Sequence, residues 1–94
     1  MAQLTSRCNP NDPLFRANAE AYDGLLADLH AKFDWALAGG GAKMVDRHYK
    51  RNKLLVRDRI DLLIDPLTPF LELSPLAGWG MYNNGLPSAG IVTG

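Results

Sequence analysis

Apolar residues recur every three or four positions between Pro13 and Leu37, and this spacing predicts one long amphipathic helix. Asn11 or Asp12 can cap its first turn, and proline suits the first helical position because the N–H that it lacks would have no intrahelical partner there. The glycine triplet 39–41 ends the segment, since glycine adopts the left-handed cap conformation without steric cost. The apolar stripe consists of Phe15, Tyr22, Leu25, Leu26, Leu29, Phe33 and Leu37.

Two shorter helices are expected after the glycine triplet, at residues 42–50 and at about 56–64. Pro66 and Pro69 rule out further helix, because proline lacks the backbone donor and its ring clashes with the preceding turn. Short strands are then predicted at residues 70–73, 78–82 and 90–94. Helices followed by strands, the last of them without a partner, predict part of a larger α/β domain.

The overall composition is that of a folded protein, with 47% hydrophobic and 21% charged residues. Ten basic and ten acidic side chains cancel, so no net charge marks the whole chain as a nucleic-acid or membrane binder. The charge is nevertheless uneven, because five acids between residues 11 and 38 are followed by seven bases between residues 43 and 59. This asymmetry would let the two segments attract each other, or would present the basic segment to an anion.

A convincing catalytic or metal-binding set is absent from the sequence. His30 and His48 lie on different expected helices with no carboxylate at the spacing of a dyad, so packed or solvated histidines are expected. Cys8 is the single cysteine, which excludes an internal disulfide and favours a reducing compartment. Residues 1–8 are polar and lack the apolar core of a signal peptide, so a cytoplasmic protein is expected.

The basic segment 43–59 has two interpretations. In the first it is an anion site whose seven bases engage the phosphates of a coenzyme or a nucleic acid, with Lys50, Arg51 and Lys53 near the end of one helix and Arg57 and Arg59 on the next. In the second it is a solvated surface with ion pairs such as Arg57–Asp61, each worth about 0.2–0.5 kcal/mol at this helical spacing. Composition alone favours the solvated surface.

Residues 51–73, RNKLLVRDRIDLLIDPLTPFLEL, resemble a known motif. The motif is R-G-K-L-x-x-R-E-R-I-D-x-L-L-D-x-G-S-x-F-x-E-L of the carboxyltransferase (β) subunits of biotin-dependent acyl-CoA carboxylases. The resemblance continues at residues 40–43 and at 90–94, where a G-I-I-T-G-type strand is usual, and residues 65–73 are most similar to the methylcrotonoyl-CoA carboxylase branch. Asn52 departs from the motif's glycine, and Leu67 and Thr68 replace its glycine and serine.

The resemblance implies a crotonase-like (ClpP/crotonase) fold, in which residues 11–94 would be the incomplete amino-terminal part of the first domain, preceded by a flexible segment 1–10. The family transfers a carboxyl group from carboxybiotin to the enolate of an acyl-CoA, here of the methylcrotonoyl type. Backbone N–H groups of glycine-rich turns stabilise that enolate, and they are expected beyond Gly94. No catalytic residue is therefore assigned, and the chain alone is expected to be inactive. Lys53 and Arg57 are candidate contacts to the coenzyme A phosphates.

The implied partners follow from the same resemblance. They are a biotin carboxylase or biotin carrier subunit that brings the biotin, further carboxyltransferase subunits in a homo-oligomer, and the acyl-CoA substrate. No metal, nucleic acid or membrane is expected. Two other interpretations stay open: a self-contained, non-catalytic helical interaction module with a basic surface, and a weak nucleic-acid binder, which the zero net charge argues against.

Overall fold

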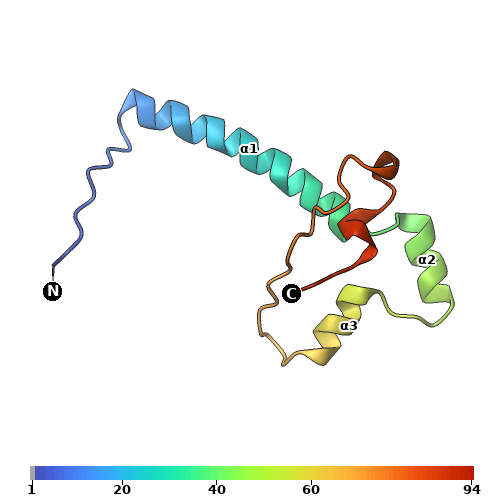
Figure 1. Ribbon diagram of the computed structural model, residues 1–94. Helices are drawn as coiled ribbons and strands as arrows, with labels where there is room; N and C mark the ends of the chain where they lie inside the picture. Colours follow the sequence, from blue (N-terminus) through green and yellow to red (C-terminus); the bar gives the residue numbers. More distant parts are fainter. Residues whose placement is uncertain (1) are drawn as a thin grey trace. The chain divides into compact units, whose positions relative to one another are not determined.

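The computed structural model describes residues 2–94 and is built from helices and turns (Figure 1). Its elements are α1 (Pro13–Leu37), α2 (Ala42–Lys50), α3 (Val56–Leu63) and the 3₁₀ helices η1 (Tyr82–Asn84) and η2 (Pro87–Gly90). The chain divides into two compact units, the first ending at Ala31 and the second running from Lys32 to Gly94. The boundary falls within α1. No helix among the described residues combines the length and the hydropathy needed to cross a membrane.

The long first helix is confirmed with the expected ends. The backbone N–H of Leu14 donates to the Asp12 carboxylate at 2.9 Å, so Asp12 rather than Asn11 caps the first turn. In the first unit most of the predicted apolar stripe is exposed, with Tyr22 68% and Leu25 66% accessible, and Leu29 is half-buried. The amphipathic pattern thus predicted the helix correctly, but residues 2–31 supply no surface on which it packs. The flexibility expected for residues 1–10 stays a prediction.

The two short helices of the second unit are also confirmed, α3 ending one residue before the expected limit. The end of α2 is closed by the backbone, because the N–H groups of Arg51 and Lys53 both donate to the carbonyl of His48. Asn52 lies between them with φ +55°, in the left-handed region that glycine and asparagine tolerate best. The family motif has glycine at this position. The positive φ explains both residues, because glycine and asparagine are the residues that adopt it most readily.

The strands expected at residues 70–73, 78–82 and 90–94 are not found among the described residues. One antiparallel bridge joins Leu73 to Thr93, with the Leu73 N–H donating to the Thr93 carbonyl at 2.7 Å. Residues 78–80 form turns instead, in which Gly78 and Gly80 have φ of +82° and +77°, and Tyr82 begins η1. The periodicity was compatible with strands, but a stable ladder needs neighbouring strands along its length, and one bridge does not provide them. The α/β class is therefore not observed within residues 2–94, which are helical.

The interior of the chain is small. Ala36 and Ser88 are the buried residues of the described chain, at 1% and 5% exposure. The accessible surface is 8239 Å², compared with about 5,400 Å² for a compact monomer of this mass. Large apolar side chains in the second unit, such as Leu63 at 84% and Leu71 at 78%, remain exposed. Residues 2–94 therefore offer too little apolar surface to cover these side chains.

A pair of tryptophans forms the main aromatic contact of the second unit. The rings of Trp35 and Trp79 meet edge to face, with centroids 4.9 Å apart and planes at 88°. The indole N–H of Trp35 donates to the carbonyl of Asn84 at 3.0 Å, and the ammonium of Lys32 lies 5.4 Å from the Trp79 ring centre. These contacts attach the last turns of α1 to the segment that contains η1.

Candidate functional site

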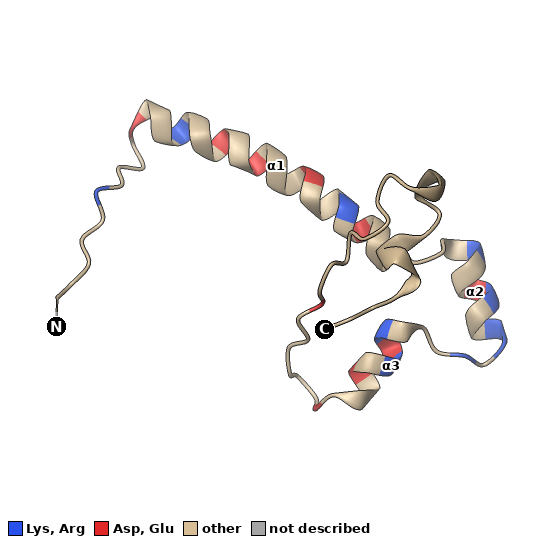
Figure 2. Ribbon diagram, viewed as in Figure 1, with Lys and Arg blue, Asp and Glu red and all other residues tan. Residues whose placement is uncertain are grey.

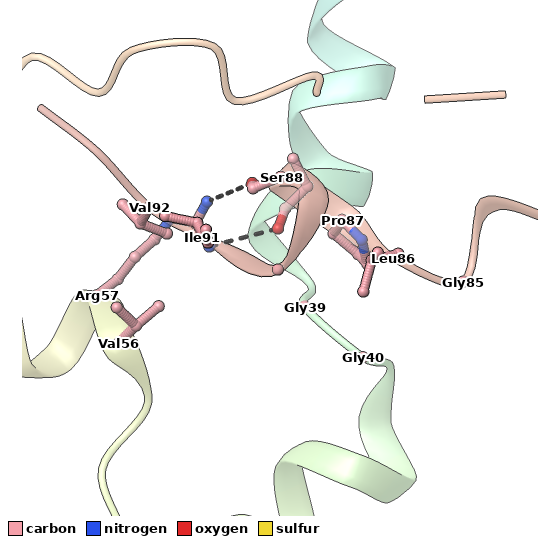
Figure 3. A pocket seen from close by; sticks show the side chains of 12 residues that line it. Gly39, Gly40, Val56, Arg57, Gly85, Leu86, Pro87, Ser88, Ile91 and Val92 are labelled. Atoms are coloured by element: carbon pink, nitrogen blue, oxygen red, sulfur yellow. Dashed lines mark hydrogen bonds between the residues drawn. The ribbon is translucent and has the colours of Figure 1, made fainter. Parts of the chain in front are cut away.

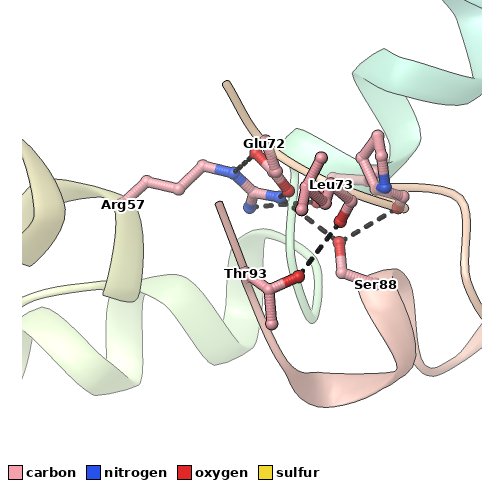
Figure 4. Close-up of polar contacts among 7 residues, drawn as sticks. Arg57, Glu72, Leu73, Ser88 and Thr93 are labelled. Atoms are coloured by element: carbon pink, nitrogen blue, oxygen red, sulfur yellow. Dashed lines mark hydrogen bonds and ion pairs between the residues drawn. The ribbon is translucent and has the colours of Figure 1, made fainter. Parts of the chain in front are cut away.

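Arg57 is the centre of a polar network in the second unit (Figure 4). Its Nε and Nη2 donate to the two carboxylate oxygens of Glu72 at 3.0 and 2.6 Å, which is the bidentate geometry that a planar guanidinium favours. Nη2 also donates to Ser88 Oγ at 3.3 Å, and Nη1 donates to the Ala36 carbonyl at 3.4 Å. The Ser88 hydroxyl in turn donates to the Pro75 carbonyl at 3.1 Å. One side chain on α3 thus holds the end of α1 and two segments of the irregular tail.

The helical spacing predicted an ion pair between Arg57 and Asp61, and this prediction is wrong. Arg57 pairs with Glu72, fifteen positions along the chain, and both side chains are largely shielded, at 26% and 19% exposure. A guanidinium enclosed by a carboxylate, a hydroxyl and a carbonyl has little capacity left for a phosphate. Arg57 acts in this structure as a cross-link within the unit.

A hollow of about 230 Å³ lies beside this network (Figure 3). Its walls come from the end of α1, the glycines Gly39 and Gly40, the start of α3 and residues 85–92. Arg57 is the one charged residue that lines it, and four of its five N–H donors are already used within the chain. No histidine, carboxylate or second cation of the described residues lines the hollow, so its wall offers no side chain suited to general acid–base catalysis.

Lys53, the other candidate coenzyme A contact, lies in a different environment. It lines two adjoining hollows of about 300 and 450 Å³, and His48 lines both of them as well. The cations around these hollows are Arg47, Arg51, Lys53 and Arg59, which together are called the basic surface below. Figure 2 shows Lys and Arg gathered along α2 and the loop that follows it. Of the seven bases that the sequence offered as an anion site, Lys43, Lys50 and Arg57 do not line these two hollows.

His48 fixes the loop that carries Lys53. Its Nε2 lies 3.0 Å from the carbonyl oxygen of Leu54. Because a carbonyl can only accept, Nε2 must carry the proton and donate it in this bond. The bond holds residues 52–54 close to α2, so that Lys53 stays beside the arginines of that helix.

Tyr49 and Asp58 link α2 to the start of α3. The Tyr49 hydroxyl donates to Asp58 Oδ2 at 2.6 Å, and the same oxygen accepts the backbone N–H of Leu55 at 3.2 Å, capping α3. The hydrogen bond to Asp58 raises the pKa of Tyr49 above its ordinary value of 10.0, with partial desolvation and the negative charge of Asp58 acting in the same direction. The two helices are therefore joined by a bond that requires the phenol to be protonated.

This link predicts a distinct alkaline titration. A folded-state pKa above the unfolded value means that the bond stabilises the fold below about pH 10 and is lost as the pH rises through the higher folded value. We expect the absorbance titration of tyrosinate to show a late component that disappears in Tyr49→Phe. Tyr22→Phe, on the exposed surface of the first unit, should retain that component. Persistence of the late component in Tyr49→Phe would contradict the assignment.

The chain is similar in sequence to known proteins over most of its length. Over 84 residues it is 50% identical to the mitochondrial methylcrotonoyl-CoA carboxylase beta chain of Arabidopsis thaliana, covering 89% of this chain. Over 91 residues it is 47% identical to a probable biotin-dependent acyl-coenzyme A carboxylase beta2 subunit of Mycobacterium tuberculosis, covering 97% of this chain. The chain is homologous to the β subunits of biotin-dependent acyl-CoA carboxylases. The resemblance found in residues 40–94 is thereby confirmed.

The homology to acyl-CoA carboxylase β subunits covers a limited part of those proteins. The chain spans 14% and 17% of the length of the two relatives named above. The propionyl-CoA carboxylase beta chain of Rattus norvegicus is 42% identical over 66 residues, which is 63% of this chain. No protein-family model matches the chain.

Metal-binding and redox groups are sparse in this acyl-CoA carboxylase homologue. Within residues 2–94, no three His, Cys, Asp or Glu side chains are grouped so that they could hold a metal ion. Cys8 is a free, exposed thiol. Of the predicted bases, Lys50 lies on α2, Arg57 and Arg59 lie on α3, and Arg51 and Lys53 lie in the loop between them. Glu72 and Ser88 carried no local signal of their contacts with Arg57.

Proposed function

We propose that the chain forms part of the carboxyltransferase subunit of a biotin-dependent acyl-CoA carboxylase, which transfers a carboxyl group from carboxybiotin to an acyl-CoA. The observation that carries this proposal is the identity of 39–50% to relatives with such names over 81–97% of the chain. The biotin would be bound to a carrier partner, and other copies of the subunit would complete the assembly. No residue of this chain is assigned to the transfer step itself.

The proposed acyl-CoA is branched and unsaturated, of the methylcrotonoyl type. Relatives named methylcrotonoyl-CoA carboxylase beta chain match over 89–97% of the chain, and those named propionyl-CoA carboxylase beta chain match over 63%. The role proposed for residues 2–94 is structural, because Arg57 cross-links α1, α3 and the tail into a unit that other parts of such a subunit would cover. The exposed apolar residues of α1 support this role.

The proposal is tested on the full-length gene product that contains these residues, assayed with a biotinylated carrier partner, a biotin carboxylase and ATP, which together form the carboxybiotin. We expect incorporation of labelled bicarbonate into methylcrotonoyl-CoA to be sensitive to avidin and at least about tenfold more efficient than into propionyl-CoA, since a pocket discriminates small apolar differences by about 1–3 kcal/mol. Preference for propionyl-CoA would overturn the substrate class alone. Absence of carboxylation with every acyl-CoA would overturn the proposed function.

The exposed stripe of α1 is also the observation that favours the alternative, a non-catalytic helical interaction module. Such a module would associate through Phe15, Tyr22 and Leu25, all exposed in the first unit. Sedimentation of the chain would then show a helical dimer whose population rises with concentration. The cytoplasmic location stays a prediction, to be checked by cell fractionation.

A further inference from the structure

Two of the seven bases between residues 43 and 59 form ion pairs. Lys50 pairs with Asp46 at 2.6 Å, and Arg57 pairs with Glu72. The four members of the basic surface take part in no ion pair or side-chain hydrogen bond within residues 2–94. Like charges that are crowded without counter-charges repel one another, and a bound anion would relieve that repulsion.

The end of α2 does not account for these cations. Bases near a helix carboxyl terminus often serve its free carbonyls. Here the backbone N–H groups of Arg51, Asn52 and Lys53 donate to the carbonyls of His48 and Tyr49. Because the backbone itself closes the helix, the side chains of Arg51 and Lys53 are left for another partner.

The backbone brings the basic surface together in a defined way. Met44, Arg47 and His48 share one side of α2, Arg51 follows as its C-cap residue three positions after His48, and all four line the first hollow. The left-handed turn at Asn52 reverses the chain and places Lys53 against the same hollow. Arg59 reaches the adjoining hollow from α3.

We infer that the basic surface binds the phosphate groups of a small phosphorylated ligand at the two adjoining hollows. Guanidinium groups donate two parallel hydrogen bonds to phosphate, and Lys53, which lines both hollows, adds a point charge between them. A small ligand fits better than a nucleic acid, because the carboxylates Asp46 and Asp58 lie on the same two helices and the chain has no net positive charge. The inference rests on the proposed function only for the identity of the ligand, which would be the acyl-CoA.

The test measures binding of inorganic pyrophosphate and of coenzyme A to the full-length protein by calorimetry. We expect Arg51→Ala/Lys53→Ala to weaken both affinities by about 10- to 100-fold, as the loss of two charge-assisted contacts implies. The charge-matched control is Arg7→Ala/Arg16→Ala, which removes two exposed arginines from the first unit and should change affinity less than about twofold. Fluorescence of Trp35 and Trp79 verifies that each variant keeps the second unit folded. If the double alanine variant unfolds, Arg51→Gln/Lys53→Gln replaces it.

Three results would overturn the inference: unchanged affinity in the double variant, an equal loss in the control, or tighter and more salt-dependent binding of RNA or DNA than of pyrophosphate. Carboxylation kinetics separate this inference from the proposed function. An active enzyme whose KM for acyl-CoA is unchanged in Arg51→Ala/Lys53→Ala would overturn the phosphate site and leave the function standing. Absence of carboxylation, together with phosphate binding that the double variant loses, would overturn the function and support the site.

Discussion

Replacing Arg57 by alanine is expected to destabilise residues 32–94 by about 2–3 kcal/mol, more than any other single charge removal in the chain. The substitution leaves the Glu72 carboxylate without its cation at 19% exposure and removes donors from Ser88 Oγ and from the Ala36 carbonyl. The cost falls below that of a fully buried pair because water still reaches both side chains. Urea unfolding measures it, and the signal is fluorescence from Trp35 and Trp79, which lie in the same unit.

Lys50→Ala is the matched control for Arg57→Ala. It also breaks an ion pair of 2.6 Å, but Lys50 and Asp46 are 75% and 60% exposed, so the expected change is at most about 0.5 kcal/mol. Arg57→Lys should lie between the two, because lysine keeps the charge and loses the bidentate geometry. If Arg57→Ala costs no more than Lys50→Ala, the network does not hold the unit together.

Replacing Gly78 by alanine is the second substitution with a large expected effect. Gly78 has φ +82°, and a methyl group there would lie 2.8 Å from the carbonyl oxygen of Leu86. The left-handed backbone costs a non-glycine residue about 1–2 kcal/mol, and relieving the collision adds about 1–3 kcal/mol. We therefore expect Gly78→Ala to destabilise the second unit by about 2–4 kcal/mol in the same urea experiment.

Gly80 provides the control for the collision. Its φ of +77° carries the same backbone cost, but a methyl group there would meet nothing within 4 Å. Gly80→Ala should therefore cost only the about 1–2 kcal/mol of the left-handed conformation. Equal losses for the two variants would show that the chain around Leu86 yields, and that the close approach of the two turns is not needed for folding.

Local chemistry determined the helices of this protein from the sequence alone. The cap at Asp12, the apolar spacing along α1 and the glycine triplet after it are short-range signals, and the structure follows them almost residue for residue. The motif in residues 51–73 is also local, and it was sufficient to predict the homology to acyl-CoA carboxylase β subunits. The helices could be predicted because each of their signals depends on residues within one or two helical turns, and the motif could be recognised because its residues are contiguous in the sequence.

Tertiary structure alone decided the rest, because it depends on contacts between distant residues. Arg57 could have paired with Asp61 on its own helix, and only the path of the tail brings Glu72 and Ser88 to it. That choice separates Arg57 from Lys53, which sequence analysis had placed in one site. The absence of the expected strands also depends on distant contacts. A strand forms only where a second strand supplies its hydrogen bonds. Residues 2–94 supply a single bridge, between Leu73 and Thr93.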